Sequence, residues 1–156
     1  MDPRRWHLAQ FNVAHLRQPL DHPDTASFVD ALASVNELAE ASPGFVWRLK
    51  DEEGQSSSYV VAYDDPLMII NLSVWETVED LHHFVFQTAH TAYLRRRREW
   101  FERMAEAYLA CWWVPAGSVP TVEEAVARLA RLRRDGPSDD VFTLHDARLA
   151  PASQPA

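Results

Sequence analysis

The stretch Asn71-Leu-Ser-Val-Trp-Glu-Thr-Val-Glu-Asp-Leu-His-His-Phe-Val-Phe-Gln-Thr-Ala-His90 decides the fold. Its first residues continue an apolar run that begins at Leu67, which is typical of a buried strand. Thr77-x-x-Asp80 then has the pattern of a helix capping box, in which a threonine side chain accepts a backbone hydrogen bond. Apolar residues follow at helical spacing, namely Val78, Leu81, Phe84 and Val85. The stretch therefore predicts a strand, a sharp polar turn and an amphipathic helix.

The segments on either side supply the remaining elements of an α+β domain. Further strands are expected at 6–16, 45–50 and 109–114, with a short strand or extended connection at 59–63 and a short edge strand at 141–144. Further helices are expected at 24–41, 88–105 and 121–135. The order is strand, helix, strand, strand, helix, strand, with an extra helix appended, which is the ferredoxin-like split βαβ order. We expect a single domain over residues 1–146 and a disordered tail over 147–156.

The central strands are apolar on both faces, which bears on assembly. A ferredoxin-like sheet carries its helices on one face and would leave the other face bare. A second copy of the sheet closing face to face would bury that surface. The sequence therefore predicts a homodimer in which the two sheets pack face to face.

Composition excludes several classes of function. With 15 basic and 23 acidic residues the formal net charge is −8, which argues against nucleic acid as a partner. No apolar window approaches the length of a membrane span, so we expect no membrane partner and a cytoplasmic location. Cys111 is the single cysteine and lies in an apolar run, so we expect a buried structural thiol. No glycine-rich phosphate loop or Gly-x-Ser-x-Gly elbow occurs.

His90 and Asn12 are the candidate catalytic residues, and Asn71 is a candidate for binding the substrate. His90 is expected at a helix start, where the helix dipole favours the neutral imidazole that a base or a metal ligand needs. Asn12 and Asn71 are expected on strands, where a buried amide must find a hydrogen bond. An asparagine at such a place can steady an oxyanion, or it can bond to the neighbouring backbone instead. The alternative for His90 is a histidine hydrogen-bonded at a corner between helices.

Three further residues are candidates for binding the ligand. Asn71, Ser73 and Trp75 share one face of their strand if it alternates regularly, so Trp75 can wall an aromatic ligand or belong to the core. His83 is the more inward of two adjacent histidines. Arg97 follows His90 by seven residues and can hold a carboxylate or phenolate, whereas the rest of the arginine run reads as a solvated helix face. No histidine pair has the i, i+4 spacing of a zinc site, so no metal is expected.

Several motifs together resemble the bacterial family called domain of unknown function 3291. They are Gln10-Phe-Asn-Val-Ala, Asn71-Leu-Ser-Val-Trp-Glu, Ala89-His90, Arg95-Arg-Arg-Arg-Glu-Trp-Phe and Trp112-Trp-Val-Pro-Ala-Gly117. That family resembles a branch of the dimeric α+β barrel superfamily, which includes antibiotic-biosynthesis and heme-degrading monooxygenases. The resemblance implies the same fold that the order of elements predicts.

A finer resemblance concerns the heme-degrading members, which place an Asn on the first strand, a Trp on the helix after the third strand and a heme-ligating His shortly afterwards. Asn12 and His90 match the first and the last of these. The helix carries His83, Phe84 and Phe86 in place of the Trp, which argues against heme degradation.

The resemblance, taken with these candidate residues, implies a small-molecule enzyme of the monooxygenase-like kind, acting on an aromatic or polyketide-like compound in a pocket between sheet and helices. We expect no cofactor, with heme ligated by His90 as the alternative. The competing hypothesis is a ligand-binding or heme-binding protein without turnover.

Overall fold

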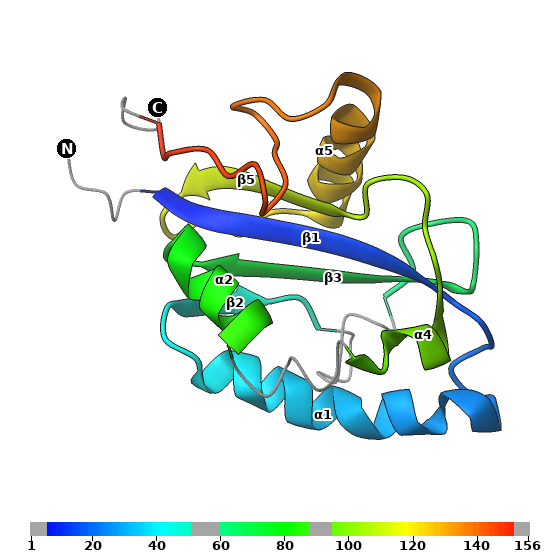
Figure 1. Ribbon diagram of the computed structural model, residues 1–156. Helices are drawn as coiled ribbons and strands as arrows, with labels where there is room; N and C mark the ends of the chain where they lie inside the picture. The colour runs from blue at the N-terminus through cyan, green and yellow to red at the C-terminus, as the bar shows by residue number, and fades with distance from the viewer. Residues whose placement is uncertain (1–5, 51–59, 88–94, 152–156) are drawn as a thin grey trace.

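The computed structural model describes residues 6–50, 60–87 and 95–151. The first half contains β1 (Trp6–Leu16), a 3₁₀ turn at Pro23–Thr25, α1 (Ala26–Ala41), β2 (Phe45–Arg48) and β3 (Met68–Trp75). The second half contains α2 (Val78–Gln87), α4 (Arg97–Trp100), β4 (Phe101–Glu102), β5 (Leu109–Pro115) and α5 (Val122–Asp135), as Figure 1 shows.

The sheet is antiparallel and has the order β2-β3-β1, with β5 and β4 both pairing with β1 on its remaining side. β5 pairs with Trp6–Asn12 of β1, and β4 pairs with His15 and Leu16. This is the split βαβ order that the sequence predicts, and the α+β fold class is confirmed. Residues 60–67 form no strand, and in the expected edge strand at 141–144 only Phe142 bridges to Cys111.

The pleat of β1 divides its side chains between two packed layers. Leu8 belongs to a core cluster with Trp75, Leu81 and Phe84, which joins this face of the sheet to α2. On the same face, Phe28 of α1 packs with Leu16 and Ile69. The helices that belong to the split βαβ unit thus lie together on one face, as expected.

The opposite face is covered by α5, and this corrects the expectation of helices on one face only. Phe11, Leu72 and Trp112 are fully buried. They pack with three buried residues of α5, namely Ala125, Leu129 and Leu132. In Figure 1, α5 lies beside β5 and away from α1. The bare face that motivated the homodimer is therefore not found in the described part of the chain, and the homodimer stays a prediction without that premise.

A helix was expected over 88–105, and this prediction is wrong for residues 101–105, which are not helical. α4 ends there, and Phe101 and Glu102 pair with β1. The end of β1 captures two carbonyls of α4, because Arg17 N donates to Trp100 O at 2.8 Å and Arg17 Nε donates to Arg98 O at 2.9 Å. The rings of Trp100 and Phe101 both pack on Phe28, at centroid distances of 5.4 and 5.0 Å. Successive aromatic residues can share one partner at a helix end more readily than along a helix, and this tertiary contact overrides the helical pattern.

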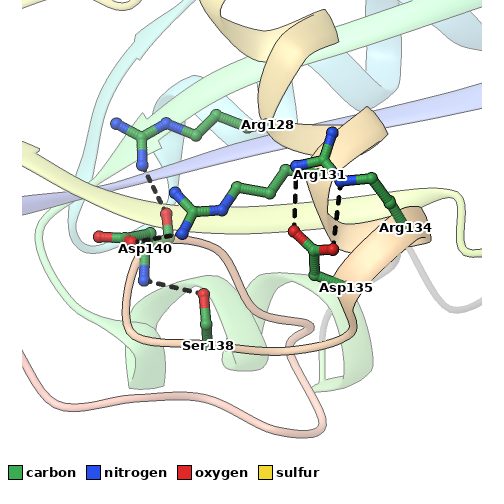
Figure 2. A network of polar contacts seen from close by, with 6 residues as sticks. All are labelled: Arg128, Arg131, Arg134, Asp135, Ser138 and Asp140. Carbon is green, nitrogen blue, oxygen red and sulfur yellow. Dashed lines mark hydrogen bonds and ion pairs between the residues drawn. The ribbon is translucent and has the colours of Figure 1, made fainter.

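Arginines of α5 fasten the loop that follows it (Figure 2). Arg128 donates to Asp140 O at 2.6 Å, and Arg131 Nη2 lies 2.9 Å from Asp140 Oδ2. Two residues later, Phe142 and Cys111 exchange backbone hydrogen bonds of 2.7 and 2.9 Å. The loop thereby brings residues 143–145 to the face of the sheet that carries α1 and α2.

No helix within the described ranges combines the length and the apolar character needed to cross a membrane.

Candidate functional site

A cavity of about 540 Å³ lies between the sheet and the helices α1 and α2. Its floor is the sheet face with Gln10, Asn12, Asn71, Ser73 and Trp75. The walls are mostly apolar, with Phe28, Leu32 and Val35 from α1 and Leu81, Phe84 and Val85 from α2. Apolar walls with a few placed polar groups are typical of small-molecule sites.

Strand register gathers the polar groups into two adjacent rows of the floor. Asn12 faces Asn71 across the β1–β3 ladder, and Gln10 faces Ser73. Arg48 of β2 continues the second row, because it is the register partner of Ser73. Apolar residues lie beyond the band on both sides: the pair Leu8 and Trp75 on one side, and the pair Ala14 and Ile69 on the other. A ligand on this floor therefore meets polar groups only near its middle.

A chain of hydrogen bonds orders one part of the floor. Gln10 Nε2 donates to Asn71 Oδ1 at 2.7 Å and to Ser73 Oγ at 3.1 Å, and Trp75 Nε1 donates to the same Ser73 oxygen at 3.0 Å. Gln10 and Ser73 are 4% and 6% exposed. Buried polar groups that are satisfied in this way hold one another rigidly.

Asn12 takes no part in this series of hydrogen bonds. Its side chain makes no hydrogen bond to any residue within the described ranges, and it is half-buried in the cavity wall. An amide without a protein partner in an apolar cavity is destabilising unless a ligand or water bonds to it. This is the property expected of a binding residue.

Trp75 lines the cavity, but it is held as part of the core. It is 1% exposed and packs between Phe45, edge-on at 5.6 Å, and Phe84, stacked at 5.1 Å. Its indole N–H is engaged by Ser73. Trp75 therefore offers a ligand at most a small part of its surface and mainly fixes Ser73.

His83 does not line this cavity, which corrects the sequence prediction. The apolar residues of α2 turn Leu81 and Phe84 toward the sheet, so His82 and His83 face outward and are exposed. Both line a shallow surface hollow with Pro43, Val78, Glu79 and Asp80. Within the described residues, no group of three His, Cys, Asp or Glu side chains could hold a metal ion.

Arg97 lies at an exposed part of the cavity wall, together with Tyr108. Its guanidinium sits 5.1 Å from the centre of the Tyr108 ring, and Nη1 donates to the Tyr108 hydroxyl at 3.4 Å. No carboxylate of the described residues forms an ion pair with Arg97; the neighbouring Arg96 pairs with Glu99 instead. Arg97 can therefore still meet an anionic group of a ligand.

His90 lies outside the described residues, so its role as base or ligand stays a prediction. Ser73, expected on the polar face of its strand, lines the cavity, and so do three polar residues that the sequence did not single out: Gln10, Arg48 and His145. Strand alternation places Gln10 on the same face of β1 as Asn12 and is the signal that could have found it. Nothing in the sequence pattern marks His145, because its place depends on the loop after α5.

Cys111 lies on the same sheet face, and it is a buried free thiol, as predicted. Burial raises its pKa to about 12, so the thiol stays neutral and is a poor nucleophile at neutral pH.

The family model described as domain of unknown function DUF3291 matches residues 7–156. The chain belongs to the DUF3291 family. The match covers every described strand and helix except the first residue of β1, and it includes all the residues of the cavity floor.

No curated protein matches the sequence. Among solved structures, PA3566 from Pseudomonas aeruginosa aligns with a TM-score of 0.48 and 8% identity over 72% of this chain and 95% of its own. SnoaB from Streptomyces nogalater, described as a cofactor-independent oxygenase, aligns with a TM-score of 0.45 and 14% identity over 72% and 95%. A monooxygenase from the gene ActVA-Orf6 of Streptomyces coelicolor, in complex with Nanaomycin D, aligns with a TM-score of 0.40 and 18% identity over 77% and 95%. These TM-scores lie below 0.5, so functional conclusions rest on the cavity of this chain.

Proposed function

We propose that the protein binds a small, largely apolar molecule between the sheet and the helices α1 and α2, and oxygenates it. The observation that carries this proposal is the cavity of about 540 Å³ whose apolar walls enclose a band of amide side chains. Asn12 supports it further, because its amide has no hydrogen-bond partner in the described part of the chain. The ligand class that we propose is an aromatic or polyketide-like compound.

The chemistry that fits these groups needs no cofactor. A base takes the proton of an acidic phenol, and neutral amide donors such as Asn12 and Asn71 hold the resulting oxyanion. The electron-rich anion then reacts with molecular oxygen, which is the oxidant: one oxygen atom enters the substrate as a carbonyl, and the other leaves as water. His90 is the base that we propose, and Arg97 can hold a second anionic group.

Oxygen consumption with a phenolic anthrone as the probe tests this function. The wild-type protein should consume oxygen faster than buffer alone, and Asn12→Ala should lower the rate about 10- to 100-fold, since one oxyanion donor typically contributes at least that much. His90→Ala should lower the rate of oxygen consumption further, because it removes the proposed base. A wild-type rate equal to that of buffer, with the anthrone shown to bind, would overturn the oxygenase and leave a binding protein.

A binding protein without turnover is the second candidate, and one observation favours it. The titratable residues that line the cavity in the described part of the chain are Arg48, Arg97, Tyr108 and His145; none is a carboxylate, and His145 is exposed. If His90 proves dispensable, the site lacks an enclosed base.

Heme is the alternative cofactor, and the described residues give it little support. His145 is the histidine that lines the cavity in the described ranges, and it lies at an exposed place rather than on the floor. An axial ligand would thus depend on His90. Absence of a Soret band after added hemin would exclude this alternative. The homodimer and the cytoplasmic location remain predictions.

A further inference from the structure

The orientation of one side chain on the cavity floor determines what the floor can recognise. The carbonyl oxygen Oδ1 of Asn71 accepts a hydrogen bond of 2.7 Å from Gln10 Nε2. An amide whose oxygen is engaged presents its N–H groups elsewhere. The Asn71 Nδ2 group makes no hydrogen bond to a described residue, and Asn71 is half-buried on the cavity wall. Asn71 therefore offers the cavity donors.

Gln10 makes a second hydrogen bond, to Ser73, which links it to the core. An indole N–H can only donate, so the Ser73 oxygen accepts from Trp75 Nε1 at 3.0 Å. The same oxygen accepts from Gln10 Nε2 at 3.1 Å. Both hydrogens of the Gln10 amide group are thus used, one on Ser73 and one on Asn71. Trp75, packed between two aromatic rings, anchors this series of contacts in the core.

Asn12 lies directly beside this donor. It is the cross-strand register partner of Asn71, and directly opposed residues in an antiparallel pair place their Cβ atoms about 4.5–5.5 Å apart. An unpartnered amide can turn its own N–H groups toward the same point. Two amides at this separation can hold a single oxygen atom between them.

We propose that Gln10 is a positioning residue that turns the Asn71 N–H groups into the cavity, so that the site selects ligands with a hydrogen-bond-accepting oxygen, such as a ketone or a phenolate. Gln10 acts through Asn71 and does not itself need to touch the ligand. This inference deepens the proposed function and rests on ligand binding in the same cavity.

The test compares tetralin with α-tetralone, which share a two-ring carbon frame and differ by one ketone oxygen. Equilibrium dialysis gives both dissociation constants for each variant, and their ratio reports the advantage that the oxygen gives. Asn71→Leu should lower that advantage about 5- to 10-fold, the effect of one net hydrogen bond. Gln10→Met should lower it at least about threefold, because the freed amide no longer presents its donors in a fixed orientation. Gln18→Met, an exposed glutamine, is the matched control and should leave the ratio unchanged.

The ratio distinguishes positioning from support of the fold. A residue that only stabilises the structure would change the tetralin and tetralone affinities together. If Gln10→Met fails to fold, Asn71→Leu at a half-buried position still decides whether the donor exists. A ratio that stays at the wild-type value in Asn71→Leu, or in folded Gln10→Met, overturns the inference while tetralin binding upholds the cavity. Failure of the wild-type protein to bind either compound would overturn ligand binding in the cavity and this inference with it.

Discussion

Asn12 combines a polar side chain with a place where the fold gives it nothing to bond to. Natural proteins lose stability at functional sites for this reason, and the loss is recovered when the polar group is removed. Gln10, two residues earlier on the same face, differs because its amide is engaged twice by neighbouring side chains. We therefore expect Asn12 to serve ligand binding and Gln10 to contribute to the stability of the fold as well.

Asn12→Leu should raise the free energy of unfolding by about 0.5–1 kcal/mol while weakening ligand binding, because an unsatisfied amide is replaced by apolar surface. Gln10→Leu should lower it by about 1–3 kcal/mol, since it removes two hydrogen bonds, one to buried Ser73 and one to half-buried Asn71. Urea unfolding followed by circular dichroism measures both. A loss of stability in Asn12→Leu comparable to that in Gln10→Leu would show that Asn12 serves the fold.

Cys111 should resist alkylation by iodoacetamide at pH 8 until the protein unfolds. Its folded pKa of about 12 lies above the ordinary value of 9, so the neutral thiol prevails in the native state. The raised pKa of Cys111 contributes to the free energy of unfolding; this contribution is complete below pH 9 and is lost as the pH rises toward 12. Labelling followed by mass spectrometry in increasing urea should track the unfolding transition; rapid labelling of native protein would contradict the burial.

At the scale of elements, the turn between α1 and β2 depends on a glycine that contacts α2. Gly44 has φ +81°, and its carbonyl accepts from Glu76 N at 2.7 Å. A Cβ at this position would overlap the Asp80 carboxyl group. The glycine thus lets the start of β2 approach the start of α2, which frames one end of the cavity.

Gly44→Ala should lower the free energy of unfolding by about 2–4 kcal/mol, the sum of a left-handed backbone and a steric overlap. Gly117→Ala is the matched control, because Gly117 has φ +90° and open space around the position of a Cβ. It should cost only about 1–2 kcal/mol. Equal thermal shifts in the two variants would contradict a close approach of Asp80.

Elements differ in how far local sequence determines them. Strand alternation in β1 and β3 and the capping threonine before α2, Thr77, whose hydroxyl accepts from Asp80 N at 3.0 Å, act over a few residues and were predicted. α4 was predicted too long, because the contacts that end it come from Arg17 and Phe28, about 70–80 residues away along the chain. The polar face of the floor was predictable by parity; the hydrogen bonds between Gln10, Asn71 and Ser73 needed the strand register.

At the scale of the whole molecule, α5 occupies the face that the sequence assigned to a second copy. The apolar strands were correctly expected to need a cover. Which element supplies it depends on where the chain goes after β5, and neither composition nor periodicity contains that information. Trp112 packs under α5, with the Arg128 guanidinium 5.8 Å from its ring centre.

Leu129→Ala should therefore lower the free energy of unfolding by about 2–5 kcal/mol, the usual range for a cavity created in a core. Arg131→Ala, on the same helix, is the control: it removes a half-exposed ion pair with Asp140 of the following loop and should cost less than about 1 kcal/mol. Chemical denaturation measures both. A Leu129→Ala effect as small as that of Arg131→Ala would indicate that α5 covers the sheet only loosely.

The bridge between Cys111 and Phe142 has a consequence for assembly. An exposed sheet edge can recruit a strand from another molecule, and proteins commonly block such edges with part of their own chain. Here the backbone amide and carbonyl of Cys111, on the outer edge of β5, are both hydrogen-bonded to Phe142. A second copy could pair edge to edge with β5 at Cys111 only if residues 141–142 first left this strand, so the loop that lines the cavity also protects this part of the sheet edge.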